Sequence, residues 1–449
     1  MNKILEKKAK RSTTRTIAEG FALIILAGAV LLSLPIATTS GDSDFLTALF
    51  TATSATCVTG LAVADTYQHW TLFGQLVIFC LIQIGGLGFM TIGVYISVLL
   101  RRKIGLQQRA DLHESVNTLQ LAGVVRLAKG IVQGTLLFEG VGALLLATRF
   151  VPEFGLPKGI YFSIFHAVSS FCNAGFDLMG IKEEYSSLTS FEGDVVVNLV
   201  IMSLILIGGL GFIVWEDIYH NKWHVKKYLL HTKIVLTATI VLTVGGTVAF
   251  LILEGNNSLA GMTPLQKLLG AMFDSVTPRT AGFNTTDTAS LSNAGKLLTM
   301  VYMFIGGNPG STAGGIKTTT MVVLLFYAVA MVRNHEDINL FNRRLSEDVV
   351  KKANAVVMIN FTLAMIAAVF IMSMQDGLLF EDVIFEVLSA IGTVGMTTGI
   401  TRDLGLVSKI ILIVLMYCGR LGSLSFALVF AQKKAIDSVR KPQEKIIVG

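Results

Sequence analysis

Charged residues are scarce in this chain. Only 15% of its 449 residues are Asp, Glu, Lys or Arg, whereas 53% are hydrophobic; a soluble globular protein carries about 25% charged residues. The mean hydropathy is +0.67, and uncharged runs of membrane-spanning length cover most of the chain. The composition excludes a separate soluble enzyme domain and predicts an integral, all-α polytopic protein of the lipid bilayer.

Cysteine pairs and catalytic motifs are lacking as well. The four cysteines, Cys57, Cys80, Cys172 and Cys418, show no Cys-x-x-Cys spacing, so we expect packing residues rather than disulfides. The sequence contains no H-E-x-x-H and no G-x-S-x-G, and we therefore expect neither an enzyme nor a covalent cofactor. The net charge of +6 comes from basic residues that lie between apolar runs, which does not favour a nucleic-acid partner.

Eight uncharged stretches of about 20 residues predict transmembrane helices. They lie near residues 17–35, 72–100, 130–150, 194–215, 233–253, 297–332, 354–374 and 405–431. Four shorter runs, near 44–56, 160–171, 265–277 and 380–391, alternate with them. Because these runs are too short to cross a bilayer of about 30 Å, we expect re-entrant helices.

The basic residues predict the orientation of the chain. Of the 36 Lys and Arg, 26 lie in the amino terminus, the carboxyl tail and the stretches 101–129, 217–233 and 333–352. The positive-inside bias assigns these five segments to the cytoplasm. The first opposite connection, 36–71, contains no Lys or Arg. We therefore expect both termini on the cytoplasmic side of the membrane and re-entrant helices that enter from outside.

The short runs end in four similar sequences. These are TSATCVTGLAV (53–63), VSSFCNAGFD (168–177), SVTPRTAGFN (275–284) and LSAIGTVGMT (388–397). Gly60, Gly175, Gly282 and Gly395 align, and the separations between them along the chain are nearly equal. The pattern predicts four pore repeats, 17–100, 130–216, 233–333 and 354–432, with cytoplasmic segments 1–16, 101–129, 217–232, 334–353 and 433–449 between and around them.

A second set of glycines recurs in the second span of each repeat. It comprises Gly85, Gly86 and Gly88; Gly208, Gly209 and Gly211; Gly306, Gly307 and Gly310; and Gly419 and Gly422. The spacing from loop glycine to cluster is nearly constant in three repeats and longer in the second, which therefore contains an insertion. These clusters are equally consistent with close helix packing. The four loop glycines instead indicate irregular backbone at membrane depth, which is tolerated where it lines a watery cavity and so predicts a central pore.

Backbone carbonyls are the candidate ion ligands, because few side chains in the four loops can bind an ion. The predicted selectivity filter comprises Cys57, Val58, Thr59, Gly60, Cys172, Asn173, Ala174, Gly175, Arg279, Thr280, Ala281, Gly282, Gly392, Thr393, Val394 and Gly395. The predicted ligands are the carbonyls of Val58, Thr59, Asn173, Ala174, Thr280, Ala281, Thr393 and Val394. Re-entrant helices from outside aim their negative carboxyl ends at mid-membrane, which favours a cation.

Charged residues beside these loops carry further expectations. Asp65, Asp177, Asp287 and Asp403 follow the four glycines and either concentrate cations at the outer mouth or are ordinary loop acids and helix caps. Arg279 lies within the third loop, where it is unfavourable for a cation. We expect its side chain to point away from the axis, toward a carboxylate such as Asp274 or Asp287.

The third repeat contains an interrupted second span. Proline and clustered glycine destabilise a helix, so we expect an intramembrane gate loop at 306–318. Its candidate residues are Gly306, Gly307, Asn308, Pro309, Gly310, Ser311, Thr312, Ala313, Gly314, Gly315 and Lys317. Ile316 interrupts the resemblance to a phosphate-binding G-x-x-x-x-G-K-T motif, and no strand precedes it.

Arg420 is the candidate partner of this loop. It follows Gly395 at the same spacing as Gly307 follows Gly282, so both should occupy one depth. Our hypothesis is that Arg420 donates hydrogen bonds to carbonyls of the loop; the alternative is a buried ion pair with a carboxylate. Glu139, inside the run 130–150, could couple transport to protons or sodium or hydrogen-bond a neighbouring helix. His220 and His224 suggest either a metal site or a plain cytoplasmic loop.

These features resemble the Trk/Ktr/HKT superfamily of potassium transporters, and within it the membrane subunits of bacterial Ktr systems. The resemblance covers essentially the whole chain through the four repeats. In that superfamily, glycine at all four filter positions accompanies potassium passage and serine at the first accompanies sodium preference, so Gly60 implies potassium. No loop contains the T-V-G-Y-G of tetrameric potassium channels.

The resemblance also implies partners. It implies a homodimer docked on a ring of cytosolic KtrA-type subunits, which would bind ATP or ADP in place of this chain. The basic stretches 101–129, 217–233 and 333–352 are the accessible docking surface. A sodium- or proton-coupled secondary carrier is the alternative function, but it predicts inverted repeats, whereas these repeats are parallel.

Overall fold

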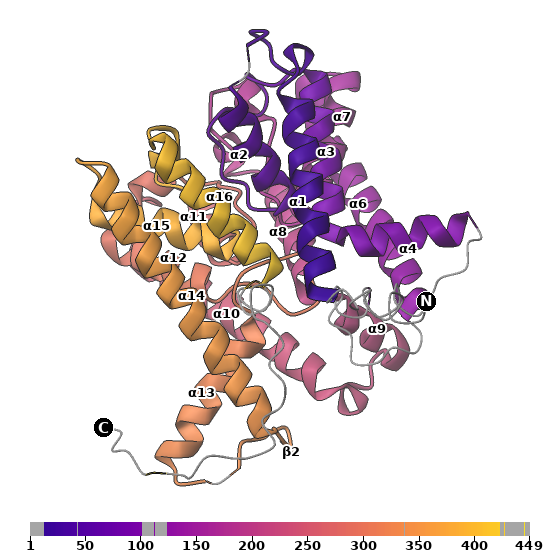
Figure 1. Ribbon diagram of the computed structural model, residues 1–449, viewed down its shortest axis with the longest axis vertical. Helices are drawn as coiled ribbons and strands as arrows, with labels where there is room; N and C mark the ends of the chain where they lie inside the picture. Colours follow the sequence, from indigo (N-terminus) through magenta and orange to yellow (C-terminus); the bar gives the residue numbers. More distant parts are fainter. Residues whose placement is uncertain are drawn as a thin grey trace, which may run out of the picture.

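The structure is a computed structural model and describes residues 13–42, 44–100, 112, 124–335, 337–422, 426 and 444. It is an all-helical membrane protein built from several apolar spans and bent helix pairs, as the composition predicts (Figure 1). Residues 1–12, almost all of the stretch 101–123 and nearly all of 423–449 lie outside the described residues. The predicted termini and the first cytoplasmic loop therefore fall largely outside it.

Within the described residues, four helices are long and apolar enough to span a membrane: α1 (Thr13–Leu32), α6 (Val124–Phe154), α10 (Leu230–Glu254) and α14 (Glu347–Met374). Each is followed by a short helix that packs against it: α2 (Phe45–Thr56), α7 (Leu156–Phe171), α11 (Pro264–Val276) and α15 (Phe380–Gly392). The short helices are the four short apolar runs of the sequence. We refer to the four long-helix–short-helix–span segments as units 1 to 4.

The second span of units 1, 2 and 3 is interrupted near its glycine cluster. In units 1 and 2, α3 (Leu72–Leu87) and α4 (Phe89–Leu99) meet at 90°, and α8 (Val195–Leu210) and α9 (Phe212–Asn221) meet at 93°. The bends lie at Gly88 and Gly211, whose φ angles of 77° and 101° are accessible to glycine but rarely to other residues. The stretches 72–100 and 194–215, each predicted as one span, are therefore bent helix pairs.

Units 3 and 4 complete the pattern. In unit 3, α12 (Asn293–Phe304) and α13 (Thr318–Val332) are separated by non-helical residues 305–317, which we call the intramembrane loop. In unit 4, α16 (Leu406–Leu421) ends at Gly422, whose φ is 84°. The expected continuation of this span to residue 431 lies outside the described residues.

Local sequence signals explain where the short helices begin. Thr263 and Gln266 form a capping box at the start of α11, with Pro264 as the first helical residue. Asp44 caps α2 by accepting a hydrogen bond from the backbone N–H of Thr47 at 3.4 Å. Side-chain caps therefore mark the first residues of α2 and α11.

Short elements connect the helices. They are the 3-10 turns η1 (Pro35–Ala37), η2 (Met179–Ile181), η3 (Thr189–Phe191), η4 (Val225–Lys227), η5 (Thr288–Ser290) and η6 (Ile400–Arg402), and an antiparallel hairpin of β1 (Asn339–Leu340) and β2 (Arg343–Arg344). The largest core cluster, which includes Phe150, Phe162, Phe165 and Phe171, packs α7 against α6 and α8. The carboxyl-terminal part of α7 is thus buried against the longer helices.

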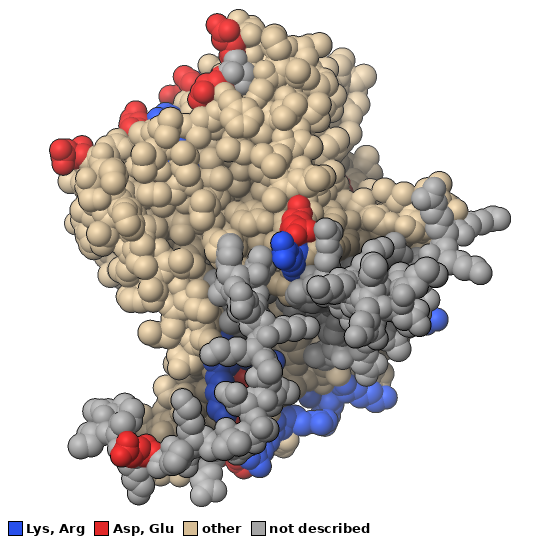
Figure 2. Space-filling model, viewed as in Figure 1, with Lys and Arg blue, Asp and Glu red and all other residues tan. Residues whose placement is uncertain are grey.

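Charge divides along the long axis of the molecule. Figure 2 shows acidic side chains along the upper end and most of the visible Lys and Arg at the lower end. The short helices α2 and α15 lie in the upper half, whereas α13 and α9 extend toward the lower end (Figure 1). The short helices therefore belong to the acidic half of the molecule.

Candidate ion path

The four predicted filter loops meet in a closed ring. A Cβ built on each loop glycine would collide with the carbonyl oxygen that precedes the glycine of the next unit. The separations would be 2.6 Å from Gly60 to Ala174, 2.7 Å from Gly175 to Ala281, 2.6 Å from Gly282 to Val394 and 2.1 Å from Gly395 to Thr59. We call residues 57–60, 172–175, 279–282 and 392–395 the loop ring. Only glycine permits this approach of one backbone to another.

The four loops share an unusual backbone conformation. Two residues before each glycine, the φ angle is positive: 51° at Val58, 57° at Asn173, 66° at Thr280 and 50° at Thr393. The glycines themselves have φ angles of 92°, 71°, 81° and 94°. A positive φ is unfavourable for β-branched residues, and such strain persists only where the surrounding structure imposes it. The fourfold repetition shows that one backbone geometry is built four times.

Hydrogen bonds to the short helices hold this geometry. The residue before the glycine donates its backbone N–H to a carbonyl near the end of its own short helix: Thr59 to Ser54 (2.8 Å), Ala174 to Ser169 (2.8 Å), Ala281 to Thr277 (3.0 Å) and Val394 to Ser389 (2.8 Å). The hydroxyls of Ser54 and Ser389 also accept the N–H of Gly60 and Gly395, both at 3.1 Å. The loop N–H groups therefore point back to the helices.

Side chains of the loop ring are turned into the protein. Those of Val58, Thr59, Thr280 and Thr393 are fully buried. The short helices also end at the ring, and the carboxyl end of a helix carries partial negative charge. The arrangement leaves backbone carbonyls as the polar groups available at the ring and gives it a potential that favours cations.

The partner of Arg279 differs from the expected carboxylate. Its side chain is buried but pairs with neither Asp274 nor Asp287; its Nη2 donates to the Thr239 hydroxyl of α10 at 3.4 Å. Asp274 instead accepts the Thr286 hydroxyl at 2.7 Å, and Asp287 caps η5. The expected carboxylate partner is wrong because Arg279, just beyond α11, extends toward α10, while both acids are already engaged within their own unit.

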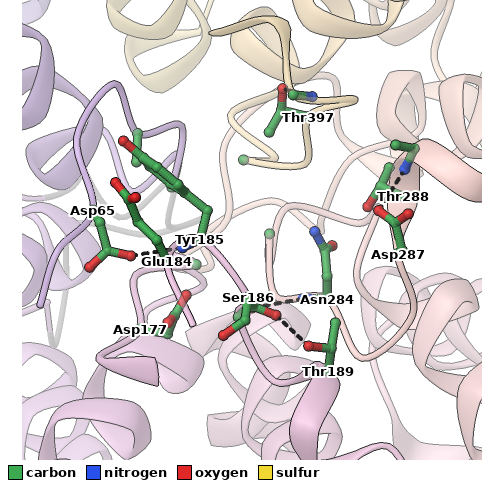
Figure 3. A pocket seen from close by; sticks show the side chains of 18 of the residues that line it. Asp65, Asp177, Glu184, Tyr185, Ser186, Thr189, Asn284, Asp287, Thr288 and Thr397 are labelled. Carbon is green, nitrogen blue, oxygen red and sulfur yellow. Dashed lines mark hydrogen bonds between the residues drawn. The ribbon is translucent and has the colours of Figure 1, made fainter. Parts of the chain in front are cut away.

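A cavity of about 350 Å³ opens directly onto the ring on its acidic side. Gly60, Gly175, Gly282 and Gly395 line it, together with Asp65, Asp177, Glu183, Glu184, Asp287 and Arg402. Figure 3 shows the acidic side chains distributed around it. We call it the acidic cavity. Three of the four aspartates that we expected at an outer mouth, Asp65, Asp177 and Asp287, therefore line one cavity beside the ring.

Asp403 is the exception. It is not among the residues that line the acidic cavity, and Arg402 occupies that place in unit 4. The reason is the short turn η6, after which the backbone carbonyl of Asp403 accepts a hydrogen bond from Gln375 at 2.8 Å. The expectation of one mouth carboxylate per unit is wrong for unit 4.

Two of the aspartates also have local structural roles. Asp65 accepts backbone N–H groups from Tyr67 at 2.8 Å, Gln68 at 2.9 Å and Tyr185 at 2.9 Å. Asp287 accepts the N–H of Ala289 at 3.1 Å. The alternative description as loop acids and helix caps thus applies to both, and it does not conflict with their place at the cavity.

Asp177 differs from these two in its protonation. Burial raises its pKa from 3.8 to about 7, and the nearby charge of Asp65 acts in the same direction. Its Oδ1 accepts the N–H of Met179 at 2.9 Å, which opposes the rise. Asp177 therefore gains or loses its charge near neutral pH, at a wall of the acidic cavity.

Unit 2 lines the acidic cavity with residues of the segment 183–189, for which the sequence predicted no role in the site. Tyr185 donates its N–H to Asp65 of unit 1, and the hydroxyl of Ser187 accepts the N–H of Asn284 of unit 3 at 3.1 Å (Figure 3). Arg402 of unit 4 stacks on the Tyr185 ring at 4.1 Å. The sequence contained one signal for this segment, the longer spacing between the loop glycine and the glycine cluster of unit 2. Residues 183–189 form part of the insertion that causes this longer spacing.

The intramembrane loop lies on the break between α8 and α9. Asn308 donates both its backbone N–H, at 3.2 Å, and its Nδ2, at 2.8 Å, to the carbonyl of Gly209. The N–H of Thr312 reaches the carbonyl of Gly208 at 3.3 Å. In return, the N–H of Phe212 donates to the carbonyl of Gly310 at 2.8 Å. The loop thus satisfies backbone groups that the bend at Gly211 leaves without helical partners.

The same loop touches the loop ring. The Thr312 hydroxyl lies 3.1 Å from the Phe171 carbonyl, at the end of α7, and 2.9 Å from Oδ1 of Asn173. A Cβ on Gly314 would lie 2.1 Å from the Thr393 hydroxyl oxygen. The side chain of Lys317 folds back onto its own loop, donating to the carbonyls of Ala313 at 2.7 Å and Gly314 at 3.0 Å. The loop therefore lies against the ring on the side opposite the acidic cavity.

Arg420 joins this loop to two other units. Its Nη1 donates to the Thr312 carbonyl, and its Nη2 donates to the carbonyls of Gly85 and, at 3.2 Å, Gly86. The hydrogen bond to the loop that our hypothesis requires is therefore present. In the described part of the chain no carboxylate forms an ion pair with Arg420. Its role in gating stays a prediction.

Glu139 and the two histidines have ordinary partners. Glu139 of α6 accepts a hydrogen bond from Gln83 of α3 at 3.2 Å. This is the hydrogen bond to a neighbouring helix that we considered as the alternative to ion coupling. His220 and His224 contact the backbone carbonyls of Glu216 at 2.8 Å and Asn221 at 3.3 Å. Among the residues that the structure describes, no three His, Cys, Asp or Glu side chains form a metal-binding group.

Comparison with known proteins identifies the family. The model of the TrkH family, described as cation transport protein, matches residues 3–440. The chain is 43% identical to the potassium/sodium uptake protein NtpJ of Enterococcus hirae, covering 99% of this chain and 100% of that protein. It is 41% identical to the Ktr system potassium uptake protein B of Bacillus subtilis, over 97% and 96% of the two chains.

A solved structure has the same fold. The crystal structure of the potassium transporter TrkH from Vibrio parahaemolyticus aligns with a TM-score of 0.73 at 19% identity, covering 95% of this chain and 86% of that one. The resemblance to Ktr membrane subunits is thereby confirmed at the level of family and fold. The chain belongs to the TrkH family of cation transport proteins, which are ion transporters and not enzymes.

Proposed function

We propose that this chain takes up potassium across the cytoplasmic membrane through the loop ring, which acts as its selectivity filter. The observation that carries the proposal is the closed ring of four glycines and four carbonyls, because a set of carbonyls from four loops can replace the hydration shell of a cation. Gly60 occupies the first filter position, where glycine favours potassium over sodium within the superfamily. The names of the relatives, which are potassium or potassium/sodium uptake proteins, agree with this substrate.

The charge distribution supports the direction of entry. The acidic cavity would face outside, where its carboxylates raise the local cation concentration, and the basic end would face the cytoplasm. Both termini would then be cytoplasmic. The predicted carbonyl ligands at Thr59, Ala174, Ala281 and Val394 belong to the residues whose oxygens approach the neighbouring glycines. The carbonyls of Val58, Asn173, Thr280 and Thr393 would form an adjacent layer.

We also propose that the intramembrane loop is the gate. It lies directly against the ring, its backbone is not helical, and Arg420 adds a positive charge on the cytoplasmic side of the filter. Its hydrogen bonds to Gly208, Gly209 and Phe212 bind it to unit 2, so displacement of the loop requires exchanging those bonds for others. Such an element can be biased by a partner acting on α9, which begins at the same bend.

Regulation would come from other chains. The relative named as a Ktr system protein supports a Ktr partner, and we propose a homodimer of this chain on a ring of KtrA-type subunits that bind ATP or ADP. The basic stretches 101–129, 217–233 and 333–352 would form the docking surface, and the last two lie almost entirely within the described residues. Sodium dependence is compatible with this arrangement. A coupled secondary carrier remains the second candidate, which only transport measurements distinguish.

Cation uptake by the purified protein in liposomes tests the function. Potassium, rubidium and sodium fluxes are compared in the wild type and in Gly60→Ser, and a serine Cβ at this position would lie 2.6 Å from the Ala174 carbonyl oxygen. We expect a potassium and rubidium preference in the wild type that falls by about tenfold in the variant, as the loss of one or more carbonyl contacts implies. Equal potassium and sodium fluxes in both proteins would exclude the filter. A flux that depends on a sodium or proton gradient would favour the carrier.

A further inference from the structure

Three short helices carry a buried polar side chain at nearly the same distance from the loop glycine. His166 lies nine residues before Gly175, Asp274 eight before Gly282 and Glu386 nine before Gly395. All three are at most 3% exposed. Burial of such groups in an apolar helix bundle is unfavourable unless hydrogen bonds compensate for it. Their recurrence in three units at nearly the same position therefore requires a common explanation.

In each unit the partner is the chain that ascends from the loop glycine toward the acidic cavity. Glu386 accepts the hydroxyl of Thr397 at 2.8 Å and that of Thr401. Asp274 accepts the hydroxyl of Thr286 at 2.7 Å. The Nε2 of His166 accepts the backbone N–H of Leu178 at 3.3 Å, because its Nδ1 faces the Phe162 carbonyl at 2.8 Å.

In units 2, 3 and 4 these contacts connect the two ends of the filter loop. The short helix leads into the loop, the loop glycine begins the ascending chain, and the buried side chain fastens that chain back to the helix. Thr286 and Thr397 also line the acidic cavity, so the fastened residues stand directly above the ring. Among the described residues, no Lys or Arg forms an ion pair with Asp274 or Glu386. Both carboxyl groups instead accept hydrogen bonds from threonine hydroxyls.

Unit 1 is built differently. Thr51, nine residues before Gly60, is buried, and its hydroxyl has no hydrogen-bond partner among the described residues. The ascending chain of unit 1 is held instead by Asp65, which accepts N–H groups of Tyr67 and Gln68 and of Tyr185 in the unit 2 insertion. The restraint of unit 1 therefore comes from the acidic cavity side and not from its short helix.

We infer that His166, Asp274 and Glu386 are positioning residues that set the ion selectivity of the loop ring by fastening the ascending chain of units 2, 3 and 4 to its short helix. The inference rests on the proposed function of the ring as a filter. Its physical basis is that discrimination between potassium and sodium requires carbonyls held at defined distances, and a loop with positive φ at two of its last three residues relaxes unless it is restrained on both sides.

Glu386 offers the sharpest test, because both of its partners are side-chain hydroxyls. The variants are Glu386→Ala, Glu386→Gln and the double variant Thr397→Val/Thr401→Val. The matched control is Glu381→Gln, on the same helix α15, where the side chain is 39% exposed and pairs with Lys296 at 3.2 Å. The readout is the ratio of potassium to sodium flux in liposomes, with thermal unfolding of each purified protein recorded in parallel.

We expect Glu386→Ala to lower the flux ratio at least about fivefold, as the loss of a buried hydrogen-bond acceptor implies. The double threonine variant should lower it similarly, and combining both changes should add little, since they remove the same contacts. Glu386→Gln, which keeps an acceptor and adds a donor, should retain most of the ratio, and Glu381→Gln all of it. A purely structural role would lower thermal stability without changing the ratio.

Three results would overturn the inference. One is a folded Glu386→Ala with the wild-type ratio. Another is a wild-type ratio in the double threonine variant, which decides the matter if Glu386→Ala does not fold. The third is an equal loss in Glu386→Gln and Glu386→Ala, which would assign the effect to the carboxylate charge. A wild-type protein without any potassium preference would refute the proposed function itself, so the two failures are distinguishable.

Discussion

Removal of the Arg420 side chain tests the gate most directly. The guanidinium group donates to Thr312 of the intramembrane loop and to Gly85 and Gly86 at the end of α3. Only the first of these bonds holds the loop, so Arg420→Ala removes one charged hydrogen bond from the closed arrangement. Such a bond contributes about 1.5–3 kcal/mol, which corresponds to a shift of roughly 10- to 150-fold in the ratio of open to closed loop.

The assay is rubidium uptake into liposomes that contain this chain alone, so that no partner sets the position of the loop. Flux through Arg420→Ala should rise well above that of the wild type. The size of the rise is limited by the ratio of closed to open loop in the wild type. Arg420→Lys keeps a positive charge but lacks the planar fork that reaches carbonyls on both sides, and it should give an intermediate flux. Arg149→Ala is the control, because Arg149 pairs with Asp194 at 3.3 Å, away from the loop.

Three outcomes would refute this reasoning. Wild-type flux in a folded Arg420→Ala would show that the bond to Thr312 does not hold the gate. Equal increases in Arg420→Ala and Arg420→Lys would show that the three-carbonyl geometry is irrelevant. An increase in Arg149→Ala of the same size would assign the effect to general loosening of the helix bundle.

Two further predictions concern the loop contact and the mouth. Thr312→Val removes the hydroxyl that contacts Phe171 and Asn173 while keeping the shape of the side chain. We expect a higher basal flux and a lower ratio of potassium to sodium flux. If both quantities stay at their wild-type values, the intramembrane loop and the loop ring are independent. Because the pKa of Asp177 is raised to about 7, the carboxyl is largely neutral below pH 7 and charged above it. Uptake at low potassium should rise about two- to tenfold as the outside pH increases through 7. Asp177→Asn should abolish this rise in a pH-jump flux measurement. The same pH profile in Asp177→Asn as in the wild type would contradict the prediction.

The repeats and the ring were predictable from sequence because both depend on glycine. A backbone that approaches another backbone within van der Waals contact cannot carry a Cβ, and this requirement leaves Gly60, Gly175, Gly282 and Gly395 in register. The short helices were predictable because an apolar run of about 12 residues cannot span a bilayer. Both inferences rest on steric and length limits that hold in any tertiary context.

The bends and the partners of the buried charges were not predictable in the same way. Gly88 and Gly211 lie in clusters that would serve close packing equally well, and only the φ angles distinguish the two roles. The sequence suggested a carboxylate partner for Arg279, but it could not show that the side chain reaches Thr239 of α10 instead. The insertion of unit 2 was visible as extra length, whereas its contacts with Asp65, Asn284 and Arg402 depend on how all four units assemble.

The register of the glycines also explains why the third unit bears the loop. Gly310 follows its loop glycine at the same spacing as Gly88 does, and Gly422 follows its own at almost that spacing, so all three occupy equivalent positions in their units. The difference is the helix before the break: counted from the loop glycine, α12 ends earlier than α3 and α16 do. Gly306, Gly307 and Pro309 unwind about one turn of helix in unit 3. The loop is thus the same broken span with its last turn released, and the freed backbone groups bind the break in unit 2 instead.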